Sequence, residues 1–358
     1  MSRSSRRLLA SASLLGLLAV AACGSAANTA APTASPDGAT SAPAPTEPLV
    51  IYSGRAEELV QPLIDQFTTE SGIEVEVRYD SSAALAAILL EEGDATPADV
   101  FFSQDAGALG ALENAELFEQ IEPEQYERVD PKYSSNEGFW VGTSGRARVL
   151  VYNTDLVPAD LLPTSVLDLT GPEYTGKVGF APGNASWQAF VTSLRVLEGE
   201  DGARAFLEAF AANDPVEFEG NGPIVDAVSA GELEFGLVNH YYLYEKASAA
   251  DGGLAAFKAR NHAFEAGDPG NLINTAGVGV IAGKGDERTA AFVEFLLSDQ
   301  VQTAFAEQTF EYPVVKGITT TVADAPPLDS LQGPDVDLSD RATLEQTQAL
   351  LREVGRLS

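Results

Sequence analysis

The strongest constraint on the fold is the alternation of strand-like and helix-like segments between residues 49 and 117. Short apolar or alternating runs indicate strands at 49–52, 73–79 and 98–102. Apolar residues at helical spacing indicate helices at 57–72, 85–93 and 106–117. This β-α-β-α-β order predicts a mostly parallel sheet with covering helices.

The same alternation continues downstream with different segment lengths. We expect strands at 148–153, 177–181 and 234–238 and helices at 186–198, 201–212, 223–231 and 287–297. The segment 274–283 reads as a strand that returns to the first sheet. These segments predict two doubly wound α/β lobes connected by more than one crossing strand.

The expected domain boundaries follow from this pattern. Lobe 1 is predicted to comprise 48–146 plus 275–316, and lobe 2 to comprise 147–274. A C-terminal extension, 317–358, carries a terminal helix from about Asp340 to Val354. We expect this helix to pack on one lobe through its apolar face, and the alternative is a tail that docks a partner.

The N-terminal segment indicates export. Arginines at positions 3, 6 and 7 precede an apolar run from Leu8 to Ala22, as in a signal peptide. The sequence from Val20 to Gly24 resembles the lipobox of bacterial lipoproteins, which implies removal of residues 1–22, lipidation of Cys23 and attachment to the cell membrane. The alternative is an ordinary cleaved signal with an incidental Cys. Residues 23–47 are rich in Ala, Ser, Thr and Pro and are predicted to be a disordered tether.

Composition excludes several classes of function. The chain has 21 basic and 53 acidic residues and a net charge of −32, so we do not expect it to bind nucleic acid through a phosphate-neutralising basic patch. We interpret this excess as an adaptation for solubility, and a functional attraction for cations is the alternative. Only two histidines are present, and no nucleophile elbow, phosphate loop or dinucleotide fingerprint occurs. The sequence therefore does not predict an enzyme.

Polar residues that follow the predicted strands are candidate ligand-binding residues. Ligands of doubly wound sheets bind beyond the carboxyl ends of the strands, where helix N-termini present free N–H groups. The candidates at such ends are Ser53-Gly54-Arg55, Ser103-Gln104-Asp105, Asn184-Ala185-Ser186 and Asn239-His240-Tyr241-Tyr242. Ser144-Gly145-Arg146 joins them, because it precedes a predicted strand that can act as a hinge.

The adjacent phenols of Tyr241 and Tyr242 are the most unusual of these candidates. Neighbouring side chains diverge within a helix or a strand, so two phenols converge most easily where a strand turns into a helix. The stretch "LVNHYYLYEKA" at 237–247 places them at such a junction. The alternative is that one tyrosine packs in the core and the other lies on the surface. His240 lies between the predicted strand and the two tyrosines, and we interpret it as a structural or supporting group.

From about residue 49 to 315 the chain resembles the ferric-iron-binding solute-binding proteins of ABC importers. Seven blocks carry the resemblance in the order of that family: "IYSGR", "TPADVFFSQDAGALGAL", "VGTSGRARVLVYN", "KVGFAPGNASWQAFVTSLR", "NDPVEFEGN", "LVNHYYLYEKA" and "INTAGVGVIAG". The resemblance implies the periplasmic-binding-protein type 2 fold, in which hinge strands join the two doubly wound α/β lobes and the ligand cleft lies between them. It further implies an extracytoplasmic protein that acts as a monomer. It also implies capture of Fe(III) and delivery to an ABC permease and its ATPase.

The resemblance also assigns roles to individual residues. Tyr241 and Tyr242 correspond to the paired tyrosine ligands of the family, and Fe³⁺ favours such charged oxygen ligands. Near the positions that hold a synergistic anion (carbonate, phosphate or citrate) the chain has Asn184, Ser186, Asn221 and Asn239. Arg55 and Arg146 resemble the arginines that neutralise this anion.

Three positions depart from the family pattern. Ala56 stands where many members have a histidine ligand, and Gln104, followed by Asp105, stands where they have glutamate. Ser186 stands where a subgroup supplies a third tyrosine. Because two phenolates cannot fill an octahedral iron site, Asp105 or Gln104, an anion, water or a chelator has to complete it.

Two other functions stay open from the sequence. The same fold can bind an organic anion, which the two arginines favour, or a polyamine, which Asp105 and cleft aromatics favour. The bound ligand can also be read by a membrane sensor instead of being transported.

Overall fold

The computed structural model describes residues 47–336 and 344–357. The predicted signal peptide, Cys23 and nearly all of the predicted tether lie outside the described residues. No helix within the two described ranges is long and apolar enough to cross a membrane.

The first half of the sheet is built from the N-terminal strands and one late strand. Strands β1 (Leu49–Ser53), β2 (Val75–Tyr79) and β3 (Val100–Ser103) are parallel, in the order β2-β1-β3. Strand β10 (Ile273–Ile281) then pairs antiparallel with β3, and the short β4 (Phe118–Glu119) also pairs with β10. The prediction that 274–283 returns to the first sheet is confirmed.

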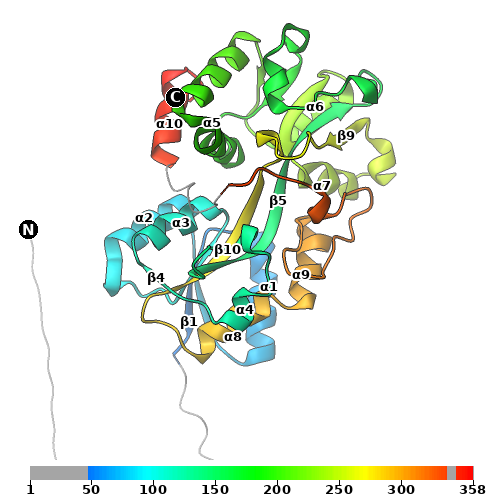
Figure 1. The fold of residues 1–358 in the computed structure, drawn as a ribbon. Coiled ribbons are helices and arrows are strands. Elements are labelled where there is room, and N and C mark those ends of the chain that lie inside the picture. Colours follow the sequence, from blue (N-terminus) through cyan, green and yellow to red (C-terminus); the bar gives the residue numbers. More distant parts are fainter. Residues whose placement is uncertain (1–46, 337–343, 358) are drawn as a thin grey trace, which may run out of the picture. The chain divides into compact units, whose positions relative to one another are not determined.

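Strand β5 (Trp140–Asn153) belongs to both halves of the sheet and runs beside β10 (Figure 1). Its residues 140–147 pair with β10, whereas residues 148–153 pair with β8 (Phe235–Asn239) and β9 (Ala259–His262). Strands β6 (Val178–Phe180) and β7 (Val216–Glu217) complete the second half. The predicted start of this strand at residue 148 is wrong. Pairing with β10 extends it, and the small and polar residues at 142–146 give no local signal of a strand.

Helices cover both faces of the first half of the sheet. Helices α1 (Glu57–Ser71) and α8 (Glu287–Leu296) pack with Val100 and Phe102, whereas α2 (Ser82–Glu92) and α3 (Ala106–Asn114) pack with Phe101. Successive side chains of β3 point to opposite faces, so one apolar strand serves two layers.

The second half is covered in the same way. Helix α5 (Ala185–Ala212) packs on the face that carries Leu237, and α6 (Asn221–Ala230) packs on the face that carries Val238. The two helices predicted at 186–198 and 201–212 are the two segments of α5, which bends at Gly199, where φ is 74°. Helix α7 (Tyr241–Ala249) follows β8 directly.

The C-terminal helix α10 (Leu344–Glu353) lies against α5 (Figure 1). Leu350 and Leu351 are buried, and the Thr347 hydroxyl lies 2.7 Å from that of Thr192 in α5. The prediction of a terminal helix that packs on the body is confirmed. Its expected first turn, from Asp340, lies outside the described residues.

A glycine in β8 sets the distance between this strand and α6. A Cβ atom at Gly236 would lie 2.2 Å from the Cγ2 atom of Ile224, which is far inside van der Waals contact. Only glycine therefore allows α6 to approach the sheet this closely, which fixes the position of Asn221 at the start of the helix.

Candidate metal and anion site

The tyrosine pair lies where the sequence predicts a junction. Strand β8 ends at Asn239, His240 follows, and α7 begins at Tyr241. The rings of Tyr241 and Tyr242 are stacked, with centroids 4.3 Å apart and planes inclined by 26°. Both side chains are partly exposed, so the alternative of one core and one surface tyrosine does not hold.

The surroundings of Tyr241 keep its phenol protonated. Burial raises the pKa of Tyr241 well above its usual value, the neighbouring Tyr242 raises it further, and Arg146 opposes the shift. A cation that binds through this oxygen has to displace the proton, which requires a strong local positive charge. The pair therefore suits a highly charged metal ion.

His240 holds the start of α7 against β5. Its ring stacks on Tyr312 with centroids 4.4 Å apart, and its Nδ1 atom accepts a hydrogen bond from the Ala147 N–H at 3.1 Å. Burial lowers the pKa of His240 to about 4, so the ring is neutral at neutral pH. These contacts support the interpretation of His240 as a structural group.

The N-termini of α5 and α6 bring three of the predicted anion-binding residues together. Asn184 caps α5, and its side-chain oxygen accepts hydrogen bonds from the N–H and the hydroxyl of Ser186 at 2.9 and 2.7 Å. The Asn221 amide, from the first residue of α6, donates to the Ser186 hydroxyl at 3.1 Å. Helix N-termini attract anions, so this convergence favours a negatively charged ligand.

Arg148 joins these three residues and was missed by the sequence analysis. One terminal nitrogen of its guanidinium donates to the Ser186 hydroxyl and the other to the Leu237 carbonyl, both at 3.0 Å. No ion pair with a carboxylate is found for Arg148 among the described residues. We call Arg148, Asn184, Ser186 and Asn221 the Arg148 cluster.

The charge of Arg148 is buried without a carboxylate partner in the part of the chain that the structure describes. The residue is 2% exposed, and its guanidinium carbon lies 5.6 Å from the ring centroid of Trp187. Burial lowers the pKa of Arg148 to about 9, and Tyr242 only partly opposes this shift. Asn239, the remaining predicted anion-binding residue, is buried opposite Arg148 in the β5–β8 register. A buried cation in this setting favours a bound anion.

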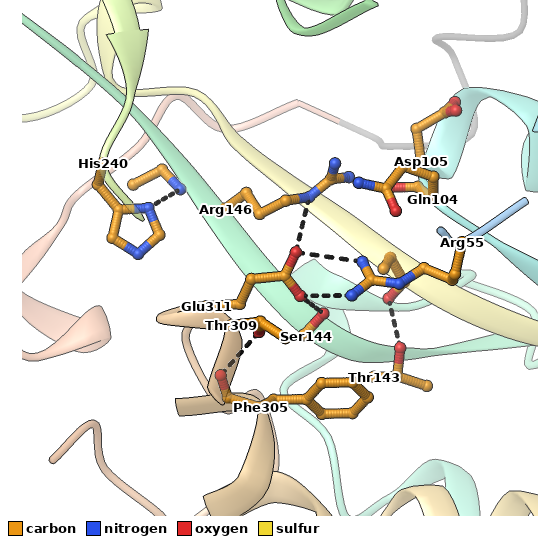
Figure 2. Close-up of polar contacts among 12 residues, drawn as sticks. Arg55, Gln104, Asp105, Thr143, Ser144, Arg146, His240, Phe305, Thr309 and Glu311 are labelled. Carbon is orange, nitrogen blue, oxygen red and sulfur yellow. Dashed lines mark hydrogen bonds and ion pairs between the residues drawn. The ribbon is translucent and has the colours of Figure 1, made fainter. Parts of the chain in front are cut away.

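Arg55 and Arg146 lie in a different cluster, around a carboxylate that the sequence did not indicate. Figure 2 shows the Glu311 carboxylate between the two guanidinium groups. Arg55 donates to both Glu311 oxygens, at 3.2 and 2.8 Å, and the Arg146 Nε atom lies 3.9 Å from one of them. The Ser144 hydroxyl also donates to Glu311. We call Arg55, Ser144, Arg146 and Glu311 the Glu311 cluster.

Gln104 and Asp105 lie at the edge of the Glu311 cluster. The Gln104 carbonyl accepts a hydrogen bond from Arg146, and the Gln104 side-chain oxygen is buried with no hydrogen-bond partner among the residues that the structure describes. The Asp105 carboxylate caps α3 by accepting from the Ala108 N–H at 3.0 Å, and it points away from Glu311 (Figure 2). Within the described residues no three His, Cys, Asp or Glu side chains gather as a metal-binding group.

The sequence from residue 95 to 337 matches the family of bacterial extracellular solute-binding proteins. The chain belongs to this family. The resemblance seen in the sequence is confirmed, and so is the predicted type 2 periplasmic-binding-protein fold.

Several relatives of this solute-binding protein are described by their names as binding iron. The Fe(3+)-binding periplasmic protein of Serratia marcescens is 32% identical over 314 residues, which cover 86% of this chain and 90% of that protein. Iron-bound HitA from Pseudomonas aeruginosa superimposes with a TM-score of 0.76 at 30% identity, over 86% of this chain and 99% of that chain. The Trichodesmium protein IdiA (FutA), in complex with iron and citrate, superimposes with a TM-score of 0.72 at 28% identity. The match covers 86% of this chain and 99% of that chain.

Proposed function

We propose that this solute-binding protein captures Fe(III) with Tyr241 and Tyr242 and delivers it to an ABC permease. The observation that carries the proposal is the stacked phenol pair at the start of α7, near the buried charge of Arg148, which has no carboxylate partner within residues 47–336 and 344–357. Phenolate is a hard, charged oxygen ligand, which suits Fe³⁺ better than softer metals. The iron-binding relatives named above, at about one-third identity or slightly less, support the same ligand.

The Arg148 cluster is the proposed site of a synergistic anion. Arg148 supplies the charge, and the Ser186 hydroxyl and the Asn221 amide supply hydrogen-bonding groups. Asn184 and Asn239 border this site. A carbonate or phosphate held there would complete the coordination that two phenolates leave open. The Trichodesmium relative holds both iron and citrate, which supports an anionic ligand in addition to the iron but not its identity in this chain.

Transport requires closure and docking in addition to binding. In our proposal lobe 1 (48–146 plus 275–316) and lobe 2 (147–274) close over the iron, with β5 and β10 as the hinge strands. The extension 317–358 adds α10 to the second lobe. Cys23 carries the lipid that anchors the protein outside the cytoplasm, and residues 23–47 are the tether that follows it.

The decisive experiment is a visible absorption titration of the metal-free protein with ferric citrate and bicarbonate. Fe³⁺ bound to tyrosinate gives an intense charge-transfer band that the reagents alone do not show. We expect a band that saturates at one iron per chain. Tyr241→Phe and Tyr242→Phe should each weaken iron binding strongly without unfolding the protein, because each removes one ligand oxygen.

Tyr244→Phe is the matched control for this titration. Tyr244 lies on the same helix, but its hydroxyl donates to the Asp324 carbonyl at 3.2 Å and takes no part in the pair. This variant should keep the band. Near-normal iron affinity in both Tyr241→Phe and Tyr242→Phe would contradict the assignment of these tyrosines as metal ligands. The absence of a band in the folded wild-type protein would instead favour the alternative ligands, an organic anion or a polyamine, which a thermal-shift screen of both classes would distinguish.

A further inference from the structure

The Glu311 cluster contains an anion that belongs to the chain itself. Glu311 is 2% exposed, Arg55 1% and Arg146 5%, so three charges are buried side by side. Both terminal nitrogens of Arg55 are used by the two Glu311 oxygens, which is the bidentate pairing that arginine makes with any carboxylate. The Glu311 carboxylate therefore occupies the place that an external anion would take on Arg55.

The backbone around Glu311 is built to hold this side chain. A π-helical turn, Phe305–Thr309, is followed by Phe310 in the left-handed region, with φ of 57°. Bulky residues adopt this region only where the surrounding structure forces them to. On the other side, Tyr312 and Gly145 exchange two backbone hydrogen bonds of 2.8 Å. Glu311 is thus fixed between a strained residue and a backbone bridge to β5.

The electrostatics of the cluster favour an ionised Glu311. Burial by itself would raise the pKa of Glu311, but the charges of Arg55 and Arg146 and the hydrogen bonds from Arg55 and Ser144 outweigh it. The pKa therefore lies below its usual value, and the carboxylate is charged at neutral pH. The Arg148 cluster has no such internal partner among the described residues.

We propose that Glu311 is a built-in counter-anion that determines which anions the site accepts. By occupying Arg55 and Arg146, Glu311 confines the external anion to the Arg148 cluster, so the protein takes one small oxyanion and has no second cationic position for a larger polycarboxylate. This inference rests on the proposed anion site, but it concerns anion binding alone and is testable without iron.

The test is a calorimetric titration of the metal-free protein with inorganic phosphate. The wild-type protein should bind one phosphate per chain. Glu311→Ala removes the carboxylate and leaves space beside Arg55 and Arg146, so it should bind a second phosphate, and formate should raise its Tm more than that of the wild type. Glu311→Gln removes the charge but fills the space, so it should gain neither effect.

Two results would overturn the proposal: two phosphates bound by the wild type, or one phosphate and no formate effect in a folded Glu311→Ala variant. Should that variant not fold even in formate, a crystal of the wild type soaked in selenate decides. An anomalous peak confined to Arg148 and Ser186 supports the proposal, and a peak on Arg55 rejects it. None of these experiments uses iron, so failure of the counter-anion proposal can be distinguished from failure of the proposed iron binding.

Discussion

The two buried arginine clusters have similar surroundings and opposite charge balance. The Arg55 guanidinium lies 5.9 Å from the ring centroid of Phe102, and that of Arg148 lies 5.9 Å from the ring centroid of Phe190. Arg55 meets a carboxylate, whereas Arg148 meets a hydroxyl and a backbone carbonyl. Burial and aromatic contacts therefore do not distinguish the two arginines. What distinguishes them is the fixed counter-charge that Arg55 has and that Arg148 lacks among the described residues.

The same contrast explains why the arginines selected from the sequence need not be the ones that hold the anion. Arg55 and Arg146 are the arginines of two "SGR" stretches, at 53–55 and 144–146, but each is close to Glu311 in the folded protein. Arg148, two residues beyond Arg146 in β5, has hydrogen bonds but no ion pair among the described residues. A charged ligand gains most where the protein has left a buried charge unpaired.

The largest expected effect is on stability, and it distinguishes the clusters directly. Glu311→Ala should lower the free energy of unfolding by about 3–5 kcal/mol, because two buried guanidinium groups lose their counter-charge. Arg148→Met should lower the free energy of unfolding by only about 1–2 kcal/mol, because it breaks hydrogen bonds but leaves no opposite charge unpaired. The same variant should abolish phosphate binding. Urea denaturation at pH 7 measures both losses of stability. Equal losses would show that the two clusters are energetically alike.

The pH dependence of stability should carry the signature of the Glu311 cluster. Because the pKa of Glu311 is lower in the folded protein, its stabilising contribution is present above the unfolded pKa of about 4.3 and is lost as pH falls through the folded pKa. Each unit of lowering is worth about 1.4 kcal/mol. Urea denaturation between pH 7 and 3 should show a shallower acid loss in Glu311→Gln than in the wild type. An identical slope in both proteins would contradict this.

The smallest expected effect concerns the hydroxyl at the centre of the Arg148 cluster. Ser186→Ala should weaken phosphate binding by roughly threefold to tenfold, or about 0.7–1.4 kcal/mol, because Arg148 and Asn221 lose a shared partner. The matched control is Ser193→Ala on the same helix, because the Ser193 hydroxyl is buried and has no hydrogen-bond partner in the described part of the chain. Calorimetry should find unchanged phosphate affinity in the control. A matching loss there would point to a general effect on α5.

Much of the fold could be predicted because its signals are local. The period of apolar residues in 57–72 predicted α1 within one residue of its observed end at Ser71. The tyrosine pair was found because the strand-to-helix transition at 239–241 is visible in the sequence. By contrast, the strand from Trp140 was predicted eight residues short, because its first part depends on pairing with β10.

The sequence by itself determined the order of the strands and helices, the position of the phenol pair and the family of the protein. These depend on spacings of a few residues and on blocks that occur in a fixed order. Only the tertiary structure decided which arginine is balanced. Arg55 and Glu311 are separated by 256 positions along the chain, and no local pattern marks either as the partner of the other. Charge balance in a buried site depends on which side chains the fold brings within a few ångströms, because in a low-dielectric interior only near neighbours can replace the lost hydration.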